Sequence, residues 1–103
     1  MNKYYFITTF SKMETDSHGF PDIGASRCWG FYKNKDTAIK AVKENWANIQ
    51  DCAYSYAMIE ECREGISNMT FWRKVFKYNK ENDSFEEIEE PAEWGCFHGF
   101  AFG

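Results

Sequence analysis

A few short stretches of this sequence carry side chains that could do chemistry. Asp16, Ser17 and His18 place a carboxylate, a hydroxyl and an imidazole next to one another, the groups that activate a nucleophile in many hydrolases. Such a triad works only when its side chains converge in space, which adjacency along the chain does not ensure. The thiol of Cys28 could pair with His18 or His98 in the same way. A Cys/His-dependent enzyme is therefore one alternative, but the pattern favours a protein that is not an enzyme, and no catalytic residue is predicted.

Metal coordination is a second chemistry to consider. Cys96 and His98 are separated by one residue, and Cys52 and Cys62 by nine. Neither spacing matches the close pairs of ligands that are typical of zinc sites. All four cysteines, including Cys28, are interpreted as free thiols, because nothing in the sequence directs the chain out of the reducing cytosol. No metal and no cofactor is predicted.

The remaining patterns indicate neither acid–base catalysis nor nucleic-acid binding. No spacing singles out two of the carboxylates as acid and base, and the sequence has no glycine-rich phosphate loop. The stretch from His98 to Phe102 is similar to the aromatic strand of RNA-recognition motifs, but that strand lies mid-domain and precedes a helix. We therefore expect no nucleic-acid partner, and expect Phe97, Phe100 and Phe102 to dock the tail onto the sheet.

Composition narrows the classes of protein further. The 103 residues fit a single domain, 1–103. A net charge of −4 argues against binding to nucleic acid or to an anionic membrane, since both require a basic surface. The sequence has no signal peptide and no run of the ~20 apolar residues that span a membrane, so a cytoplasmic protein is expected. Ten Phe, six Tyr and four Trp exceed what a small core can bury, which predicts aromatic surface for a ligand, a partner or a second copy.

The spacing of apolar residues predicts the structural elements. Residues 3–10 are mostly β-branched or aromatic on both faces, which indicates a central strand. Further strands are expected at 26–33, with Gly30 as a bulge or close approach, and at 53–60, 69–78 and 84–89. Residues 11–25 are expected to form a long loop. One helical stripe is formed by Ile39, Val42, Trp46 and Ile49. This stripe predicts a helix over about 37–50, capped by Asn34 or Asp36.

These elements follow the order ββαβββ and predict an α+β fold. One amphipathic helix cannot cover both faces of a mainly antiparallel sheet of four to five strands. We therefore expect a two-layer sandwich with the helix on one face. The second face would be open, covered by the tail or paired with another subunit. An open face or a free edge strand also favours a homodimer.

Part of the chain is similar to known reading frames. Residues 29–32, the helical run 36–45 and the strand at 54–61 resemble short uncharacterised open reading frames of Gram-positive anaerobes and their phages. The resemblance covers residues 29–61 and implies neither an activity nor a site residue. It does imply a phage or mobile-element accessory protein acting on a host protein, because such elements encode many small acidic binding proteins.

Charge and aromatic residues together suggest a candidate binding surface. Residues 81–93 contain seven acids and no base, and the strand before them carries Arg73, Lys74 and Lys77. In a hairpin these opposite charges would face each other and form a solvated edge that resists aggregation. The leading hypothesis goes further and predicts a small non-catalytic binding protein that contacts another protein through this hairpin. The residues assigned to that surface are Trp72, Phe76, Tyr78, Glu86, Glu87, Glu89 and Glu90.

A small-molecule binding protein is the alternative hypothesis. An aromatic sheet face beside the 11–25 loop could stack the planar ring of a nucleotide-like ligand. A deep pocket lined with aromatic residues would favour this alternative, whereas a flat sheet face would count against it.

Overall fold

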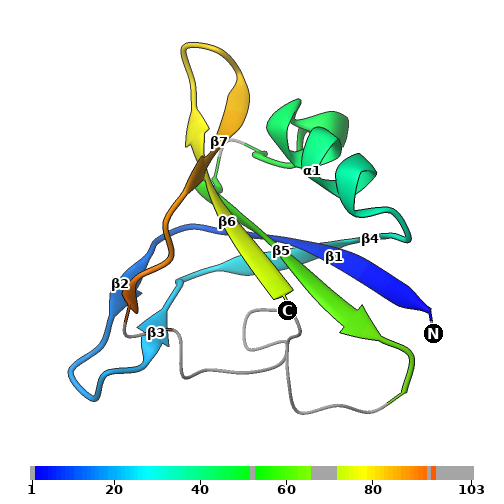
Figure 1. The fold of residues 1–103 in the computed structure, drawn as a ribbon. Helices are drawn as coiled ribbons and strands as arrows, with labels where there is room; N and C mark the ends of the chain where they lie inside the picture. Colours follow the sequence, from blue (N-terminus) through cyan, green and yellow to red (C-terminus); the bar gives the residue numbers. More distant parts are fainter. Residues whose placement is uncertain (1, 52, 66–71, 93, 95–103) are drawn as a thin grey trace.

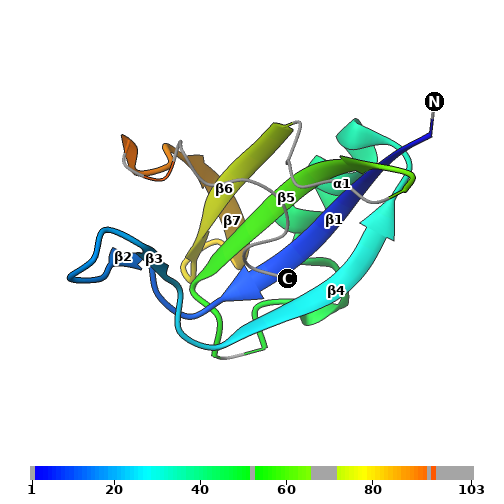
Figure 2. The same ribbon diagram turned by 90° about the horizontal axis from the view of Figure 1, so that it is seen from below.

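The computed structural model, which describes residues 2–51, 53–65, 72–92 and 94, has one main antiparallel sheet and one α-helix. The strands of the sheet are β1 (Lys3–Phe10), β4 (Ser26–Tyr32), β5 (Tyr56–Arg63), β6 (Trp72–Asn79) and β7 (Ser84–Ile88). They are arranged in the order β4-β1-β5-β6-β7. Helix α1 (Lys35–Lys43) packs on one face of this sheet (Figure 1 and Figure 2). The predicted α+β class, the ββαβββ order of the main elements and the two-layer arrangement are confirmed.

Strand pairing places β1 inside the sheet and leaves β4 and β7 at its two edges. β1 pairs with β4 on one side and with β5 on the other, which confirms the prediction of a central strand at 3–10. β5 begins three residues later than the expected strand at 53–60. The delay arises because the amides of Ala53 and Tyr54 both donate to the carbonyl of Gln50 and so belong to a turn.

Helix α1 is shorter than the helix expected at 37–50. The Asn34 side chain accepts a hydrogen bond from the Thr37 amide at 2.9 Å, so Asn34 is the N-cap, as predicted. The helix ends at Lys43 because Asn45 adopts a φ of 53°, in the left-handed region that stops a helix.

A short 3-10 segment, η1 (Trp46–Asn48), replaces the last turns of the expected helix. Ala47 and Asn48 also have positive φ angles, of 57° and 53°. Trp46 therefore leaves the buried helical stripe, and 37% of its side chain is exposed. Ile49 returns to the core and is 5% exposed.

The main core lies between α1 and the sheet. Small residues on the helix, Ala38, Ala41 and Val42, allow it to approach the strands closely. They pack against the strand residues Tyr5, Ile7, Ala57, Ile59, Phe76 and Phe85. Burial of each large apolar side chain contributes about 1.5–3 kcal/mol, so this layer is the main source of the protein's stability.

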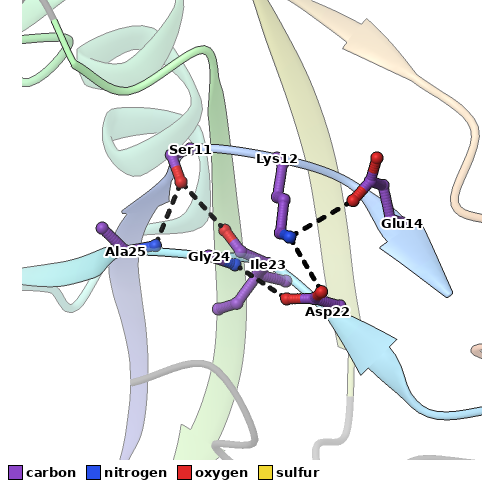
Figure 3. Close-up of polar contacts among 7 residues, drawn as sticks. All are labelled: Ser11, Lys12, Glu14, Asp22, Ile23, Gly24 and Ala25. Carbon is purple, nitrogen blue, oxygen red and sulfur yellow. Dashed lines mark hydrogen bonds and ion pairs between the residues drawn. The ribbon is translucent and has the colours of Figure 1, made fainter. Parts of the chain in front are cut away.

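Segment 11–25, expected as a loop, contains a two-stranded extension of the β1–β4 hairpin. Its strands are β2 (Glu14–Thr15) and β3 (Pro21–Asp22), which pair with each other. Figure 3 shows the polar contacts at its base, where the Ser11 hydroxyl accepts from the Ala25 amide at 3.0 Å. The Lys12 ammonium lies 2.9 Å from Asp22 and 3.3 Å from Glu14. The strands were missed because each has only two residues, too few for a periodic signal.

The face of the sheet away from α1 carries a second, smaller core. Phe10, Met58, Val75 and the fully buried Trp94 pack together there. Arg73 holds the chain after β7 in place: its guanidinium forms an ion pair with Glu90 and donates to the carbonyl of Trp94 at 2.6 Å. One end of this face is therefore covered rather than open. The predicted docking of Phe97, Phe100 and Phe102 concerns positions outside the described residues.

Candidate binding site at the β4 edge

The hairpin residues predicted to form a binding surface do not gather on one face. Phe76 is fully buried beneath α1, so its assignment as a contact residue was wrong: in this fold it is a core side chain. Trp72 is half-buried, and its ring packs against Tyr5 and the Lys35 ammonium. The Tyr78 hydroxyl donates to Asp83 at 2.6 Å.

The four glutamates of the predicted site are divided between the two faces of the β6–β7 hairpin. Glu87 lies opposite Phe76 on the helix side and forms an ion pair with Lys74 at 2.6 Å. Glu86 and Glu90 point to the other side, where they contact Asn79 and Arg73. Glu89 follows β7 and is exposed. These acids mainly satisfy basic and polar groups of their own hairpin; binding of a partner through them stays a prediction.

Asp16, Ser17 and His18, which were considered for catalysis, lie at the surface and do not form a relay, and His98 lies outside the described residues. The Asp16 carboxylate accepts from the backbone amides of His18 and Phe20, at 2.8 and 2.9 Å, and so closes the turn rather than orienting the imidazole. The Ser17 hydroxyl and the His18 ring are 3.5 Å apart and exposed. Among the described residues, no three His, Cys, Asp or Glu side chains are grouped to hold a metal ion.

The two cysteines that the structure describes, Cys28 and Cys62, are free, as predicted. Burial, with Glu60 and Glu61 nearby, raises the pKa of the Cys62 thiol, which keeps that thiol protonated at neutral pH. Cys28 is exposed on β4. Cys52 and Cys96 lie outside the described residues.

A pocket of about 280 Å³ lies beside edge strand β4, between that strand, α1 and η1. Its walls are mainly aromatic and aliphatic, from Ile7, Trp29, Tyr32, Ala41, Trp46 and Ile49. The rings of Tyr32 and Trp46 meet edge to face with centroids 6.2 Å apart. None of the described residues that line this pocket is charged, so it suits an apolar or aromatic group.

Gly30 opens this pocket because it supplies no side chain at its centre. The β1–β4 register shifts between Ile7 and Thr8, and Trp29 is the extra residue of the resulting bulge, as the glycine suggested. Gly30 lies opposite Ile7 with a φ of 140°, a conformation that favours glycine. A Cβ atom at Gly30 would have no neighbour within 4 Å, so the space above it is open.

The outer wall of the pocket is fixed by a buried amide. The Asn45 side chain is 8% exposed and donates to Asp83 at 3.0 Å, while its oxygen accepts from the Gln50 amide. The turn between β6 and β7 thereby holds the left-handed segment that carries Trp46. Strained backbone that is fixed in this way is frequent at binding sites.

The opposite side of β4 is aromatic as well. The Phe31 ring is 50% exposed and packs against Tyr4 and Phe6, with both centroid distances 5.3 Å. An edge strand presents unpaired backbone amides and carbonyls along its outer side. Within the described residues, β4 thus combines an outer edge that pairs with no other strand and apolar surface on both faces.

Basic charge flanks the same edge. The Arg27 guanidinium lies 3.6 Å from the centre of the Trp29 ring, and Lys33 directly follows Tyr32 at the end of β4. Residues 26–44 contain five basic side chains and two acidic ones. Within the described part of the chain, all ion pairs involve other bases, so Arg27 and Lys33 have no carboxylate partner there.

Sequence reasoning missed this site mainly because Trp46 was assigned to the helix core. Asn45 and Asn48 could have indicated the helix stop, since asparagine tolerates the left-handed region better than most residues. Compared with known proteins, the chain matches no protein-family model, no curated protein and no solved structure. The candidate site therefore rests on the geometry of this chain alone.

Proposed function

We propose that this protein is a non-catalytic binding domain that captures an extended segment of another protein along the outer edge of β4. The observation that carries the proposal is the position of an aromatic pocket directly beside an edge strand whose outer backbone pairs with no strand in the described part of the chain. In recognition by strand addition, main-chain hydrogen bonds supply affinity and pockets for alternate side chains supply specificity. One apolar side chain of the partner would enter the pocket above Gly30.

The volume and lining of the pocket favour a side chain of a protein partner as the ligand, rather than a nucleotide. Pockets for drug-sized ligands range from about 300 to 1,000 Å³, and this one, at about 280 Å³, lies just below that range. The part of its lining that the structure describes contains no charged group that would recognise a phosphate. A compact planar ring is the second candidate ligand, because Trp29, Tyr32 and Trp46 offer aromatic faces and edges to it.

A peptide-display selection tests the proposed function. A random peptide library is selected against the wild-type protein, and the affinities of the recovered peptides are then measured with Trp46→Ala. Trp46 is partly exposed, so its loss should spare the fold and weaken binding at least tenfold, as for a central aromatic anchor. Glu86→Ala, on the opposite edge of the sheet, is the matched control and should change affinity less than twofold.

Two outcomes would contradict the proposal. Recovered peptides that lose affinity with Glu86→Ala and keep it with Trp46→Ala would place binding on the β6–β7 hairpin instead. A selection without binders, combined with saturable binding of indole or a free nucleobase in the pocket, would favour the small-molecule alternative.

A further inference from the structure

We infer that the partner segment is acidic: a stretch of about seven extended residues with an aromatic side chain at its centre and a carboxylate near each end. This inference rests on the proposed function and specifies the partner. It arises from the order of features along β4, where Arg27, Gly30 and Lys33 are spaced three residues apart.

The centre of the segment is set by Gly30. A strand that pairs with β4 brings one residue opposite Gly30 on the helix side, where the glycine leaves the pocket open. Cross-strand neighbours on one face approach to about 5 Å, so a large side chain at that position would cover the glycine and enter the pocket. Aromatic side chains stabilise edge glycines in this way.

The ends of the segment are set by Arg27 and Lys33. Both side chains are exposed, and neither has a carboxylate partner among the described residues. The bulge at Trp29 shortens the spacing between the two positions to about 17 Å along an extended chain, which a segment of about six to seven residues spans. Because Trp29 is the extra residue of the bulge, Arg27 lies two pairing positions from Gly30 on one side and Lys33 three on the other, so the two carboxylates are unequally spaced about the central residue.

The β7 edge of the sheet has the opposite charge. Residues 79–92, which include the other edge strand, contain six acids and one base. An acidic segment would be repelled by the β7 edge and attracted to the β4 edge, so charge selects between two otherwise available edges. A basic segment would have the reverse preference.

Charge reversal tests this inference. The tightest peptide from the display selection is synthesised with Glu, Gln or Lys at two positions, two residues to one side of its central apolar residue and three to the other, in both orders. At low salt the Glu form should bind wild-type protein about fivefold more tightly than the Gln form, and the advantage should shrink as salt screens the charges. For the double variant Arg27→Glu/Lys33→Glu, the order of affinities should reverse, so that the Lys form of the peptide binds most tightly. The control variant Lys80→Glu, on the β6–β7 turn, should keep the wild-type order.

The outcomes separate this inference from the function on which it rests. Equal affinities of the three forms, with Trp46→Ala still weakening all of them, would overturn the acidic preference and leave strand capture at β4 in place. Affinities that Trp46→Ala does not change would overturn both. Sedimentation of the protein alone that shows self-association, lost in Arg27→Glu/Lys33→Glu, would identify a second copy as the occupant and overturn the inference of a separate acidic partner.

Discussion

The β4 and β7 edges of the sheet carry opposite charge. At the β7 edge, Glu87 pairs with Lys74, and Glu90, just beyond the strand, pairs with Arg73. At the β4 edge, Arg27 and Lys33 have no such partner within the described residues, and an aromatic pocket adjoins the strand. The acids of the β7 edge would repel an acidic segment, whereas the two bases of the β4 edge would attract one. Under the proposed function, β4 is the edge that takes the partner and β7 is the edge that does not.

The largest effect on the free energy of unfolding is expected from a substitution in the core beneath α1. Phe76 is fully buried, so Phe76→Ala should lower the free energy of unfolding by about 3–5 kcal/mol, from lost burial and the cavity left behind. Glu87 lies directly opposite on β7, and Glu87→Ala should cost less than about 1 kcal/mol. Chemical denaturation measures both. Similar small losses would mean that Phe76 is a surface residue, as first predicted from the sequence.

The ion pairs beside β7 should differ in strength according to burial. The Arg73 side chain is 10% exposed and also bonds the Trp94 carbonyl, so Arg73→Met should cost about 2 kcal/mol. Lys74 and Glu87 are more exposed, at 29% and 49%, so Lys74→Met should cost about 0–1 kcal/mol. Thermal unfolding of the two variants decides the order. Equal losses would show that Arg73 does not secure the chain after β7.

A glycine substitution in the strained wall of the β4 pocket should raise the free energy of unfolding, whereas the substitutions above lower it. Ala47 has a φ of 57°, which costs an L-residue about 1–2 kcal/mol, so Ala47→Gly should raise the free energy of unfolding by about 0.5–1 kcal/mol. Ala41 lies in the right-handed helix, where the same replacement should destabilise by about 1 kcal/mol or more. Denaturation curves that show destabilisation by Ala47→Gly would contradict the left-handed backbone next to the pocket.

The smallest effect on stability is expected in the two-stranded extension formed by β2 and β3. The Lys12 ammonium, with the Gly24 amide, lowers the pKa of the Asp22 carboxyl below its ordinary value near ~4. The ionised form is favoured in the folded state, so its stabilisation is complete above that ordinary pKa and is lost as the pH falls through the lower folded value. Asp22→Asn removes the charge while keeping an acceptor for the Gly24 amide. Wild-type stability should therefore fall more steeply than that of Asp22→Asn below pH ~4; parallel curves would show that the ion pair does not stabilise the extension.

Local patterns in the sequence predicted the elements better than the site. The residues of β1 and the N-cap Asn34 signal their structure through nearby neighbours, and both predictions are confirmed. The pocket depends on contacts between segments that are distant in the sequence. Gly30 of β4 lies opposite Ile7 of the neighbouring strand β1. The Trp46 ring contacts Tyr32 because the helix stops at Asn45. The acidic hairpin was recognisable as a charged edge, but the division of its glutamates between two faces follows from the register of β6 and β7.

Hydrogen exchange of the two edges in the presence of a selected peptide tests the central claim most directly. Backbone amides on the outer side of β4 pair with no strand among the described residues, so they should exchange rapidly and become protected when the peptide is added. Amides of β7 should exchange at the same rate with and without the peptide. Protection confined to β7, or peptide binding that leaves β4 exchange unchanged, would contradict strand capture at β4.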